Sequence, residues 1–245
     1  MKSIVIIPTY NEASNILNIV NKVLGVNSEV DVLIVDDGSP DGTGKIADKM
    51  ASANSQIRVL HRLEKSGLGK AYIKAFQLEL CNEYTHFIQM DADGSHRPEH
   101  LNELINLAKT NDLVIGSRWV KGGQVLNWPR NRELISRLGN FYINLILKLR
   151  VADATAGYRI YSRKLLETLP LDEIAAKGYA YQIEMTYRSK SAGAKIVEAP
   201  ITFVERVSGH SKMTLGIVLE ALLLVTYWGL SDLVQNLKGP AKDQS

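Results

Sequence analysis

The chain has 245 residues, of which 45% are hydrophobic and 22% are charged. This length suits one α/β domain, or one domain with a short appendage, because single cores stop growing near roughly 250–300 residues. The composition excludes collagen-like, low-complexity and disordered chains. The 29 basic and 26 acidic side chains give a formal charge of +3 without a long basic run, so we expect no nucleic-acid partner.

Short apolar strands predict a doubly wound α/β unit in residues 1–117. The strands begin 28, 25, 29 and 27 residues apart, which is the length of a βα unit. Their continuous apolar pattern indicates burial on both faces, as in a parallel sheet covered by helices. Apolar stripes at 16–24 and 101–108 predict two of these helices. The predicted strands are Ile4–Ile7, Val32–Val35, Ile57–Leu60, His86–Met90 and Leu113–Ile115.

The regular spacing ends at Lys121–Pro129, a stretch of turn-forming residues that we interpret as a loop. A mixed α+β unit is expected beyond it, with a strand at its end that Pro200 interrupts and therefore places at a sheet edge. The predicted elements are a helix at 134–149, a strand at 158–161, a helix at 181–192 and the edge strand at 196–204.

The ends of the chain predict neither export nor a membrane-spanning anchor. Met1 and Lys2 lead directly into the first strand, without the apolar region and cleavage site of a signal peptide. The apolar run Leu215–Leu233 is interrupted by polar residues and falls short of the roughly 18–20 clean residues that a span needs. The single cysteine, Cys81, cannot form an intramolecular disulfide, so we expect a cytoplasmic protein.

Two carboxylates follow the strand His86–Met90 at alternate positions. Asp91 and Asp93 can point the same way from an extended chain and present both carboxylates to one divalent cation, Mg²⁺ or Mn²⁺. Such a cation usually completes its shell with water and substrate phosphates, so the pattern predicts a nucleotide substrate. The alternative is a turn without a ligand, which Asp91 and Asp93-Gly94 also favour.

Further acidic residues follow the first two strands, where an open parallel sheet binds its ligands. Glu12 follows the first strand, and Asp36 with Asp37 follows the second. The aspartates predict contacts to a ribose or a base edge, with a solvated turn as the alternative. The segment Gly67–Lys70 lacks the spacing of a phosphate loop, so we expect close packing at a helix start there.

Basic side chains gather in three places later in the chain. Arg118 ends a strand, Arg130, Arg132 and Arg137 lie in and after the loop, and a third group lies at 206–212. Each is by itself typical of a solvated surface charge. Together with an acidic metal site they favour counter-charges to phosphates, which guanidinium groups bind with two parallel hydrogen bonds. A glycine and a serine within 206–212 predict a mobile loop that closes over a diphosphate.

In their order along residues 6–212, these motifs resemble those of the family-2 glycosyltransferases with a GT-A fold, in particular the dolichol- and polyprenol-phosphate mannose synthases. The matching segments are Ile6–Glu12, Val35–Thr43, Met90–His96, Gly116–Trp119, Ile135–Arg137, Thr155–Arg159 and Gly209–Lys212. The ordered set is far more specific than an isolated Asp-x-Asp pair.

The resemblance implies an α/β fold of GT-A (Rossmann-like) type. Its mostly parallel sheet would be flanked by helices, with a mixed α+β acceptor side and a C-terminal apolar amphipathic helix. Residues 1–212 would form the catalytic domain, with the nucleotide-sugar half at 1–117 and the acceptor half at 118–212. The apolar helix would occupy 213–233 and a polar tail 234–245.

The resemblance also implies an inverting, metal-dependent enzyme that moves mannose from GDP-mannose to dolichyl or polyprenyl monophosphate. The cofactor would be Mg²⁺ or Mn²⁺. A phosphate monoester is already anionic near neutral pH, so the acceptor needs no catalytic base. The alternatives are a polyprenyl-phosphate glucosyltransferase that uses UDP-glucose, a transferase that builds a polysaccharide, and a sugar-nucleotide-binding protein without turnover.

Carried over residue by residue, the resemblance assigns three sets of side chains. Asp93, Arg118 and Arg132 would be catalytic, with Arg132 binding the acceptor phosphate. The metal ligands would be Asp91, Asp93 and Ser95, although some relatives have glutamine at the position of Ser95. Donor contacts would come from Pro8, Tyr10, Glu12, Val35, Asp37, Asp91, Ala92, Asp93, Arg118, Arg206 and Lys212.

Because the implied acceptor is a membrane lipid, the helix Leu215–Leu233 is a candidate for shallow binding at a membrane surface, with Tyr227 and Trp228 near its end. The alternative is a helix packed on the core or in a dimer. The resemblance implies a peripheral protein on the cytoplasmic face of a membrane, and a separate membrane subunit is a further candidate partner.

Overall fold

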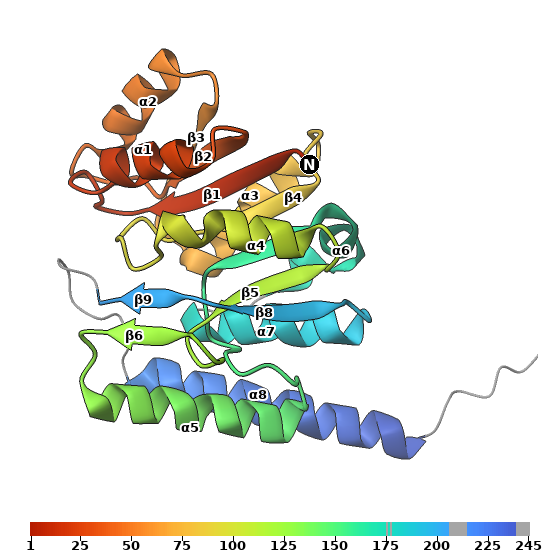
Figure 1. The fold of residues 1–245 in the computed structure, drawn as a ribbon. Coiled ribbons are helices and arrows are strands. Elements are labelled where there is room, and N and C mark those ends of the chain that lie inside the picture. The colour runs from red at the N-terminus through yellow and green to blue at the C-terminus, as the bar shows by residue number, and fades with distance from the viewer. Residues whose placement is uncertain (175, 177, 206–214, 239–245) are drawn as a thin grey trace, which may run out of the picture.

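The computed structural model describes residues 1–174, 176, 178–205 and 215–238. Within them, a main sheet has the strand order β3-β2-β1-β4-β7-β5-β8. Only β7 runs against its two neighbours, so the sheet is mostly parallel, as predicted (Figure 1). Its strands are β1 (Ser3–Thr9), β2 (Val30–Asp36), β3 (Ile57–His61), β4 (His86–Gln89), β5 (Leu113–Ser117), β7 (Arg159–Ser162) and β8 (Ile196–Pro200).

Helices cover both faces of this sheet (Figure 1). Alternate strand residues point to opposite faces: Ile4 and Ile6 belong to one core cluster, and Val5 and Ile7 to the other. The second cluster contains residues of α1 (Ile16–Val26), α2 (Thr43–Ala53) and α4 (Leu101–Ala108). The first contains residues of α3 (Leu68–Glu79), α5 (Arg130–Leu147), α6 (Arg163–Thr168), α7 (Gly178–Ser191) and α8 (Leu215–Lys238).

The first 117 residues follow the predicted βα alternation, and all five predicted strands are present. The close packing expected at Gly67–Lys70 is confirmed at the start of α3. A Cβ atom on Gly69 would lie 2.8 Å from Cδ2 of Tyr181 on α7, so only glycine fits there. Two short 3₁₀ helices, η1 (Pro98–His100) and η2 (Leu171–Glu173), complete the described elements together with the strands named next.

The second half differs from the prediction in several places, and it contains α6, which was not predicted. The segment interpreted as a loop contains β6 (Gln124–Leu126), which pairs with β9 (Thr202–Val204) in a small separate sheet. The predicted edge strand 196–204 is divided at Pro200 between β8, which does lie at the edge of the main sheet, and β9. Helix α5 begins at Arg130, directly after Pro129, whose carbonyl accepts hydrogen bonds from the Arg132 and Glu133 N–H groups. Arg130 and Arg132 therefore lie on a helix rather than in a loop.

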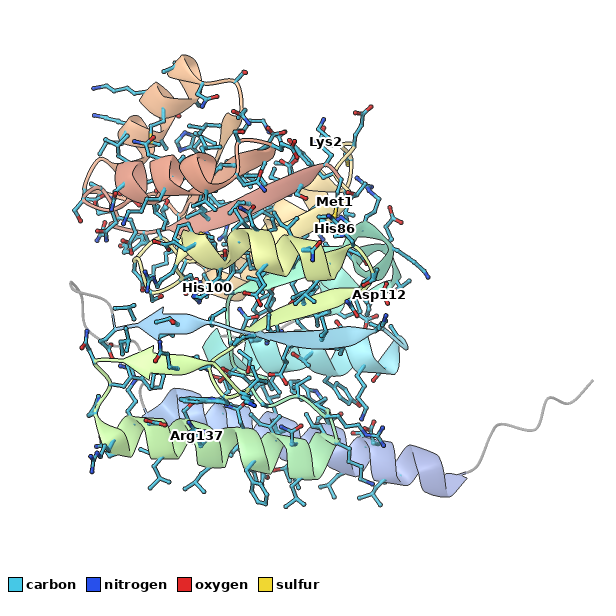
Figure 2. The ribbon with its side chains drawn as sticks, viewed as in Figure 1. Met1, Lys2, His86, His100, Asp112 and Arg137 are labelled. Atoms are coloured by element: carbon cyan, nitrogen blue, oxygen red, sulfur yellow. The ribbon has the colours of Figure 1, made fainter. Side chains whose placement is uncertain are left out.

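Helices α5 and α8 lie side by side at one end of the molecule (Figure 1). α8 continues to Lys238, so residues 234–238 belong to this helix and not to the predicted polar tail; the rest of that tail lies outside the described residues. Figure 2 shows a row of carbon-only side chains on the side of α5 that faces away from the sheet. No helix among the described residues combines the length and apolarity needed to cross a bilayer.

Candidate active site

The carboxyl ends of β1, β2 and β4 meet at one edge of the sheet, because the three strands are parallel neighbours. This edge is where open α/β sheets bind ligands. Several hydrogen bonds join the loops after β1 and β2. The Asp37 N–H donates to the Thr9 carbonyl at 3.0 Å, and the Glu12 N–H donates to Thr43 Oγ1 at 3.0 Å.

Asp37 lies in a nearly closed environment at this edge, with only 6% of its surface exposed. Its Oδ1 accepts a hydrogen bond from Arg62 Nη1 at 2.6 Å. Burial raises the pKa of Asp37 above its ordinary value, and the charge of Arg62 reverses only part of that rise. Close by, the Lys65 ammonium lies 3.9 Å from the centroid of the Tyr10 ring. Asp37 and Tyr10, two of the residues predicted to contact the sugar nucleotide, therefore lie beside the cations Arg62 and Lys65.

The neighbouring carboxylate, Asp36, is occupied by the fold itself. It accepts hydrogen bonds from the Ser39 N–H at 3.2 Å and from the Ser39 hydroxyl at 2.5 Å, and a third from Thr9 Oγ1 at 3.2 Å. Asp36 thus stabilises the turn after β2. This leaves Asp37 as the better candidate for a ligand contact at the end of β2.

Two other predicted donor residues can act only through their backbone. Val35 is fully buried in the core and Ala92 is 3% exposed. Pro8 pairs with Val35 in the β1–β2 register, one position before the last pair of these two strands. The carboxylate of Glu12 accepts a hydrogen bond from Asn15 Nδ2 at 2.8 Å, which orients it at the start of α1.

Buried aromatic side chains position Asp91. Its backbone N–H donates to His96 Nδ1 at 3.0 Å, and its Oδ1 accepts from the Tyr72 hydroxyl at 3.4 Å. Burial and the nearby Asp91 charge raise the pKa of Tyr72 well above its ordinary value, so the hydroxyl keeps its proton. His96 is 2% exposed and stacks on Tyr158 with ring centroids 5.3 Å apart.

The second carboxylate of the pair, Asp93, accepts a hydrogen bond from the Ser95 N–H at 3.0 Å. The Ser95 hydroxyl is buried and has no hydrogen-bond partner in the described part of the structure. Three or more His, Cys, Asp or Glu side chains do not converge on one point anywhere in that part. Two carboxylates and an unpartnered hydroxyl fit Mg²⁺ or Mn²⁺, which take oxygen ligands and leave positions for substrate phosphates.

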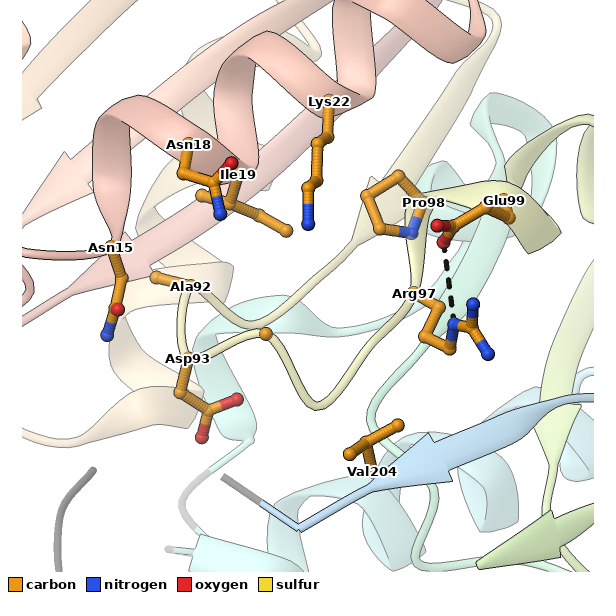
Figure 3. Close-up of a pocket in the computed structure, with 11 residues that line it drawn as sticks. Asn15, Asn18, Ile19, Lys22, Ala92, Asp93, Arg97, Pro98, Glu99 and Val204 are labelled. Carbon is orange, nitrogen blue, oxygen red and sulfur yellow. Dashed lines mark ion pairs between the residues drawn. The ribbon is translucent and has the colours of Figure 1, made fainter. Parts of the chain in front are cut away.

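A cavity of about 300 Å³ borders Asp93. Figure 3 shows it between α1 and the loop that follows β4, with Lys22 pointing into it. Arg97, on the opposite side, pairs with Glu99 at 3.6 Å. Asp93 therefore borders open space of the size that holds a small ligand.

Arg118 is buried and engaged in an ion pair. Its Nε donates to Asp153 Oδ2 at 2.7 Å and its Nη2 to Asp153 Oδ1 at 2.6 Å, and Nη2 also donates to Thr155 Oγ1 at 2.8 Å. Burial by itself would raise the pKa of Asp153, but the Arg118 charge and hydrogen bonds hold it below its ordinary value. In this structure the guanidinium is thus fixed by the loop that precedes β7.

Arg132 lies at the start of α5 within a group of aromatic rings. Its guanidinium carbon is 4.1 Å from the centroid of Trp128, and its Nη1 donates to Glu205 Oε2. The Arg137 guanidinium lies 4.3 Å from the centroid of Trp119. We name Trp119, Trp128, Arg132, Phe203 and Glu205 the aromatic–arginine cluster.

The structure thus gathers Pro8, Tyr10, Glu12 and Asp37 at one edge and places Asp91 and Asp93 at the end of the adjacent strand. Arg206 and Lys212 lie outside the described residues. The sequence reasoning missed Arg62 and Lys65, although they follow β3 and the strand-end rule would have found them. It also missed Asp153 and Glu205, for which no local signal exists because both are recognised only by distant arginines.

Comparison with known proteins agrees with these motifs. The model of the family "Glycosyl transferase family 2" matches residues 4–169. An undecaprenyl-phosphate mannosyltransferase of Micrococcus luteus is 49% identical over 231 residues, which cover 94% of this chain and 95% of that protein. A polyprenol monophosphomannose synthase of Mycolicibacterium smegmatis is 44% identical over 240 residues, or 97% of this chain and 91% of that protein.

A solved structure extends the similarity to the fold. A mannosyltransferase from Pyrobaculum calidifontis, in complex with GDP-Man and Mn²⁺, superposes with a TM-score of 0.57 at 19% identity. The similarity covers 100% of this chain and 77% of that one. The α/β architecture is therefore that of GT-A glycosyltransferases.

Proposed function

The chain belongs to glycosyl transferase family 2, and from this premise we propose that it transfers mannose from GDP-mannose to a polyprenyl monophosphate. The observation that carries the proposal is its near full-length identity of 49% to an undecaprenyl-phosphate mannosyltransferase. The product is a polyprenyl β-D-mannosyl phosphate, formed with inversion at the anomeric carbon. Dolichyl phosphate is an acceptor of the same chemical class.

Asp91 and Asp93 hold a divalent cation, Mg²⁺ or Mn²⁺, with Ser95 as a third oxygen donor. The buried, unpartnered hydroxyl of Ser95 and the preformed contacts of Asp91 support this assignment. When bound, such a cation would supply positive charge to neutralise the donor diphosphate. Arg206 and Lys212, outside the described residues, are proposed to contact the same phosphates.

The nucleoside of the donor binds at the ends of β1 and β2. Asp37 accepts hydrogen bonds from the base, Tyr10 and Glu12 line the same edge, and Pro8, Val35 and Ala92 contribute backbone surface. A carboxylate suits guanine, whose edge carries adjacent N–H donors. The Arg62 contact to Asp37 supports this role, because it orients the carboxylate and opposes part of the rise in its pKa that burial causes.

Arg132 binds the acceptor phosphate, and one acceptor oxygen attacks the anomeric carbon of mannose. The new C–O bond forms as the bond to the diphosphate breaks, and GDP leaves with the electron pair. The acceptor is already an anion, so no side chain has to remove a proton. Arg118, held in place by Asp153, would help to stabilise the negative charge of the departing diphosphate. The chief task of the protein is to align two anionic substrates.

The acceptor is a lipid, and we propose that α5 and α8 together rest on the membrane surface. Large apolar side chains on these helices are 49–66% exposed: Leu134, Ile135, Leu138, Phe141 and Leu145 on α5, and Leu223, Tyr227, Leu230, Leu233 and Val234 on α8. We name this set the apolar face. The carbon-only row on α5 in Figure 2 belongs to it. Contiguous exposed apolar surface of this kind marks a protein or membrane contact.

Charge favours a membrane over a second protein copy. Exposed cations lie at both ends of α5, namely Arg130, Lys148 and Arg150, whereas Glu133 is the one carboxylate of this helix. The cations complement anionic lipid headgroups. The apolar face also begins two residues after Arg132, so it would bring the acceptor phosphate to its proposed ligand. We place the protein at the cytoplasmic face of the membrane, where a separate membrane subunit is a further possible partner.

A transfer assay tests the proposed function. Labelled GDP-mannose is incubated with a polyprenyl phosphate and Mg²⁺ or Mn²⁺, with UDP-glucose in a parallel reaction. We expect metal-dependent label in the organic phase that mild acid releases. If only UDP-glucose gave labelled lipid, the donor would be UDP-glucose and not GDP-mannose. Binding of GDP-mannose without any lipid product would contradict the proposed acceptor.

A further inference from the structure

Buried N–H groups without a hydrogen-bond partner gather in the aromatic–arginine cluster. They are Nε1 of Trp119, Nε1 of Trp128 and Nε of Arg132, each unpartnered in the described part of the structure. An unmade hydrogen bond of a buried donor is costly, and native proteins rarely leave one without a reason. All three groups are donors only, so the complementary ligand is an acceptor, and an anion fits best.

Trp128 and Arg132 form the compact part of this cluster. The Arg132 guanidinium stacks 4.1 Å from the Trp128 ring centroid. The Trp128 ring also meets Phe203 edge to face, with centroids 5.6 Å apart, so its orientation is fixed. One indole N–H and one guanidinium N–H thus remain available in two stacked groups.

An anion already contacts Arg132 in this structure. The Glu205 carboxylate accepts from its Nη1, and the Glu205 backbone N–H donates to the Leu126 carbonyl at 3.1 Å. Glu205 satisfies Nη1 but not Nε of Arg132. The carboxylate therefore fills only part of the anion site, and a phosphate, with more acceptor oxygens, would fill more of it.

We propose that Trp128 is a further ligand of the acceptor phosphate: its indole N–H and the Nε of Arg132 bind phosphate oxygens together, after the phosphate displaces Glu205 from Arg132. The ligand is a phosphate monoester on an isoprenoid chain. The proposal rests on the proposed function, because it assigns the site to the acceptor of that reaction.

Indole NMR tests the contact directly. The chain has three tryptophans, so a protein with ¹⁵N-labelled indoles gives three Nε1–H signals, which Trp→Phe variants assign. We expect geranyl phosphate, a short soluble acceptor analogue, to shift the Trp128 signal and to leave that of Trp228 unchanged. Trp228 stacks on Tyr187 on α7, at 5.7 Å, and serves as the internal reference.

The other titrations distinguish the possible ligands. Geraniol and GDP should leave the Trp128 signal in place, because one lacks a phosphate and the other belongs to the donor site. An equal response to inorganic phosphate would indicate a general anion site and overturn the assignment to the lipid acceptor. An unmoved Trp128 signal at a geranyl phosphate concentration that saturates transfer would overturn the proposal altogether.

Kinetics supply the second test. Trp128→Phe keeps a ring but removes the N–H, and we expect the acceptor KM to rise at least about tenfold with the donor KM unchanged. Glu205→Gln should lower the acceptor KM, since it removes the competing charge. Trp228→Phe is the matched control.

An unchanged acceptor KM in Trp128→Phe, with active wild-type enzyme, contradicts this inference alone. A wild-type enzyme that forms no mannolipid contradicts the proposed function instead. If Trp128→Phe fails to fold, the NMR titration of the wild-type protein still tests whether the Trp128 indole N–H binds the acceptor phosphate.

Discussion

Arg118 and Asp153, 35 positions apart in the chain, form a two-pronged ion pair in which the arginine is 4% exposed and the aspartate is fully buried. The pair ties the end of β5 to the loop that precedes β7. Because β7 lies between β4 and β5 in the sheet, the pair also fixes the approach to the strand that connects these two.

We expect Asp153→Asn to lower the free energy of unfolding by about 3–5 kcal/mol, because it leaves the buried Arg118 charge without its counter-charge. The pKa of Asp153 is lowered in the folded protein. Its stabilising contribution is therefore present above the unfolded-state value of about 3.9 and is lost as the pH falls through the lower folded value. Urea unfolding should be measured from pH 7 to pH 3. The difference in free energy of unfolding between wild type and Asp153→Asn should become smaller below about pH 4.

The exposed pair Arg137–Glu133, joined at 2.9 Å on α5, is the control for this experiment. Glu133→Gln should change stability by only about 0.3–0.5 kcal/mol. Equal effects of Glu133→Gln and Asp153→Asn would contradict a special role for the buried pair.

Asp37→Asn should separate stability from binding. The folded-state pKa of Asp37 is raised, so the cost of its charge is absent below the ordinary value of about 3.9 and fully present at neutral pH. We expect the variant to be at least as stable as wild type at pH 7, with the difference disappearing toward pH 4. The donor KM should rise roughly tenfold or more, since an amide loses one charged acceptor. Clear destabilisation of the variant at pH 7 would contradict this prediction. It would show that the ion pair with Arg62 stabilises the protein by more than burial of the Asp37 charge costs.

Asp93→Ala should abolish turnover and leave the fold intact, because Asp93 accepts a hydrogen bond from the nearby Ser95 N–H and borders open space. Electron paramagnetic resonance of Mn²⁺ added without substrate gives a readout independent of activity, and we expect weaker metal binding. Asp48→Ala, on an exposed carboxylate that lies 2.8 Å from His61, is the matched control. Substantial retained activity would remove Asp93 from the essential residues.

Replacing Leu138 and Phe141 together by glutamate should reduce flotation of the protein with anionic vesicles. The two side chains are 58% and 66% exposed in the apolar face, so the change costs little folding stability but places charge against the lipid. The matched control carries glutamate at Leu17 and Leu78, which are 52% and 42% exposed on α1 and α3. Equal loss of flotation in both variants would argue against a specific docking face.

Gly69→Ala should destabilise the protein by about 1–3 kcal/mol, because the new methyl group would overlap the Tyr181 ring in a packed core. Gly139→Ala on α5 meets no atom within 4 Å and should instead stabilise its helix by up to about 1 kcal/mol. Thermal unfolding of the two variants checks the opposite signs. Similar melting temperatures would contradict the close packing at the start of α3.

The sequence indicated the structure of residues 1–117 well because its signals there are local. Strand spacing and apolar runs predicted β1 to β5, and acidic residues directly after strands predicted Asp37, Asp91 and Asp93 at one edge. These inferences need only the periodicity of a strand and the geometry of a parallel sheet.

The second half was harder to predict for the same reason. β6 is three residues long, and only its pairing with β9 makes it a strand. The predicted start of α5, at residue 134, is four residues too late. The first helical turn consists of polar and charged residues, so the apolar pattern begins only after it. Both features depend on contacts or boundaries that a hydrophobic pattern does not record.

The sequence by itself determined the family, the α/β class and the acidic side of the candidate site. The tertiary structure alone decided that Arg118 pairs with Asp153, that Arg132 pairs with Glu205 beside Trp128, and that α5 and α8, which both carry exposed apolar side chains, pack side by side. Each of these joins segments that are distant in the chain. Such partners are selected by burial and by the cost of leaving a charge or an N–H group unpaired, and those quantities exist only once the chain has folded.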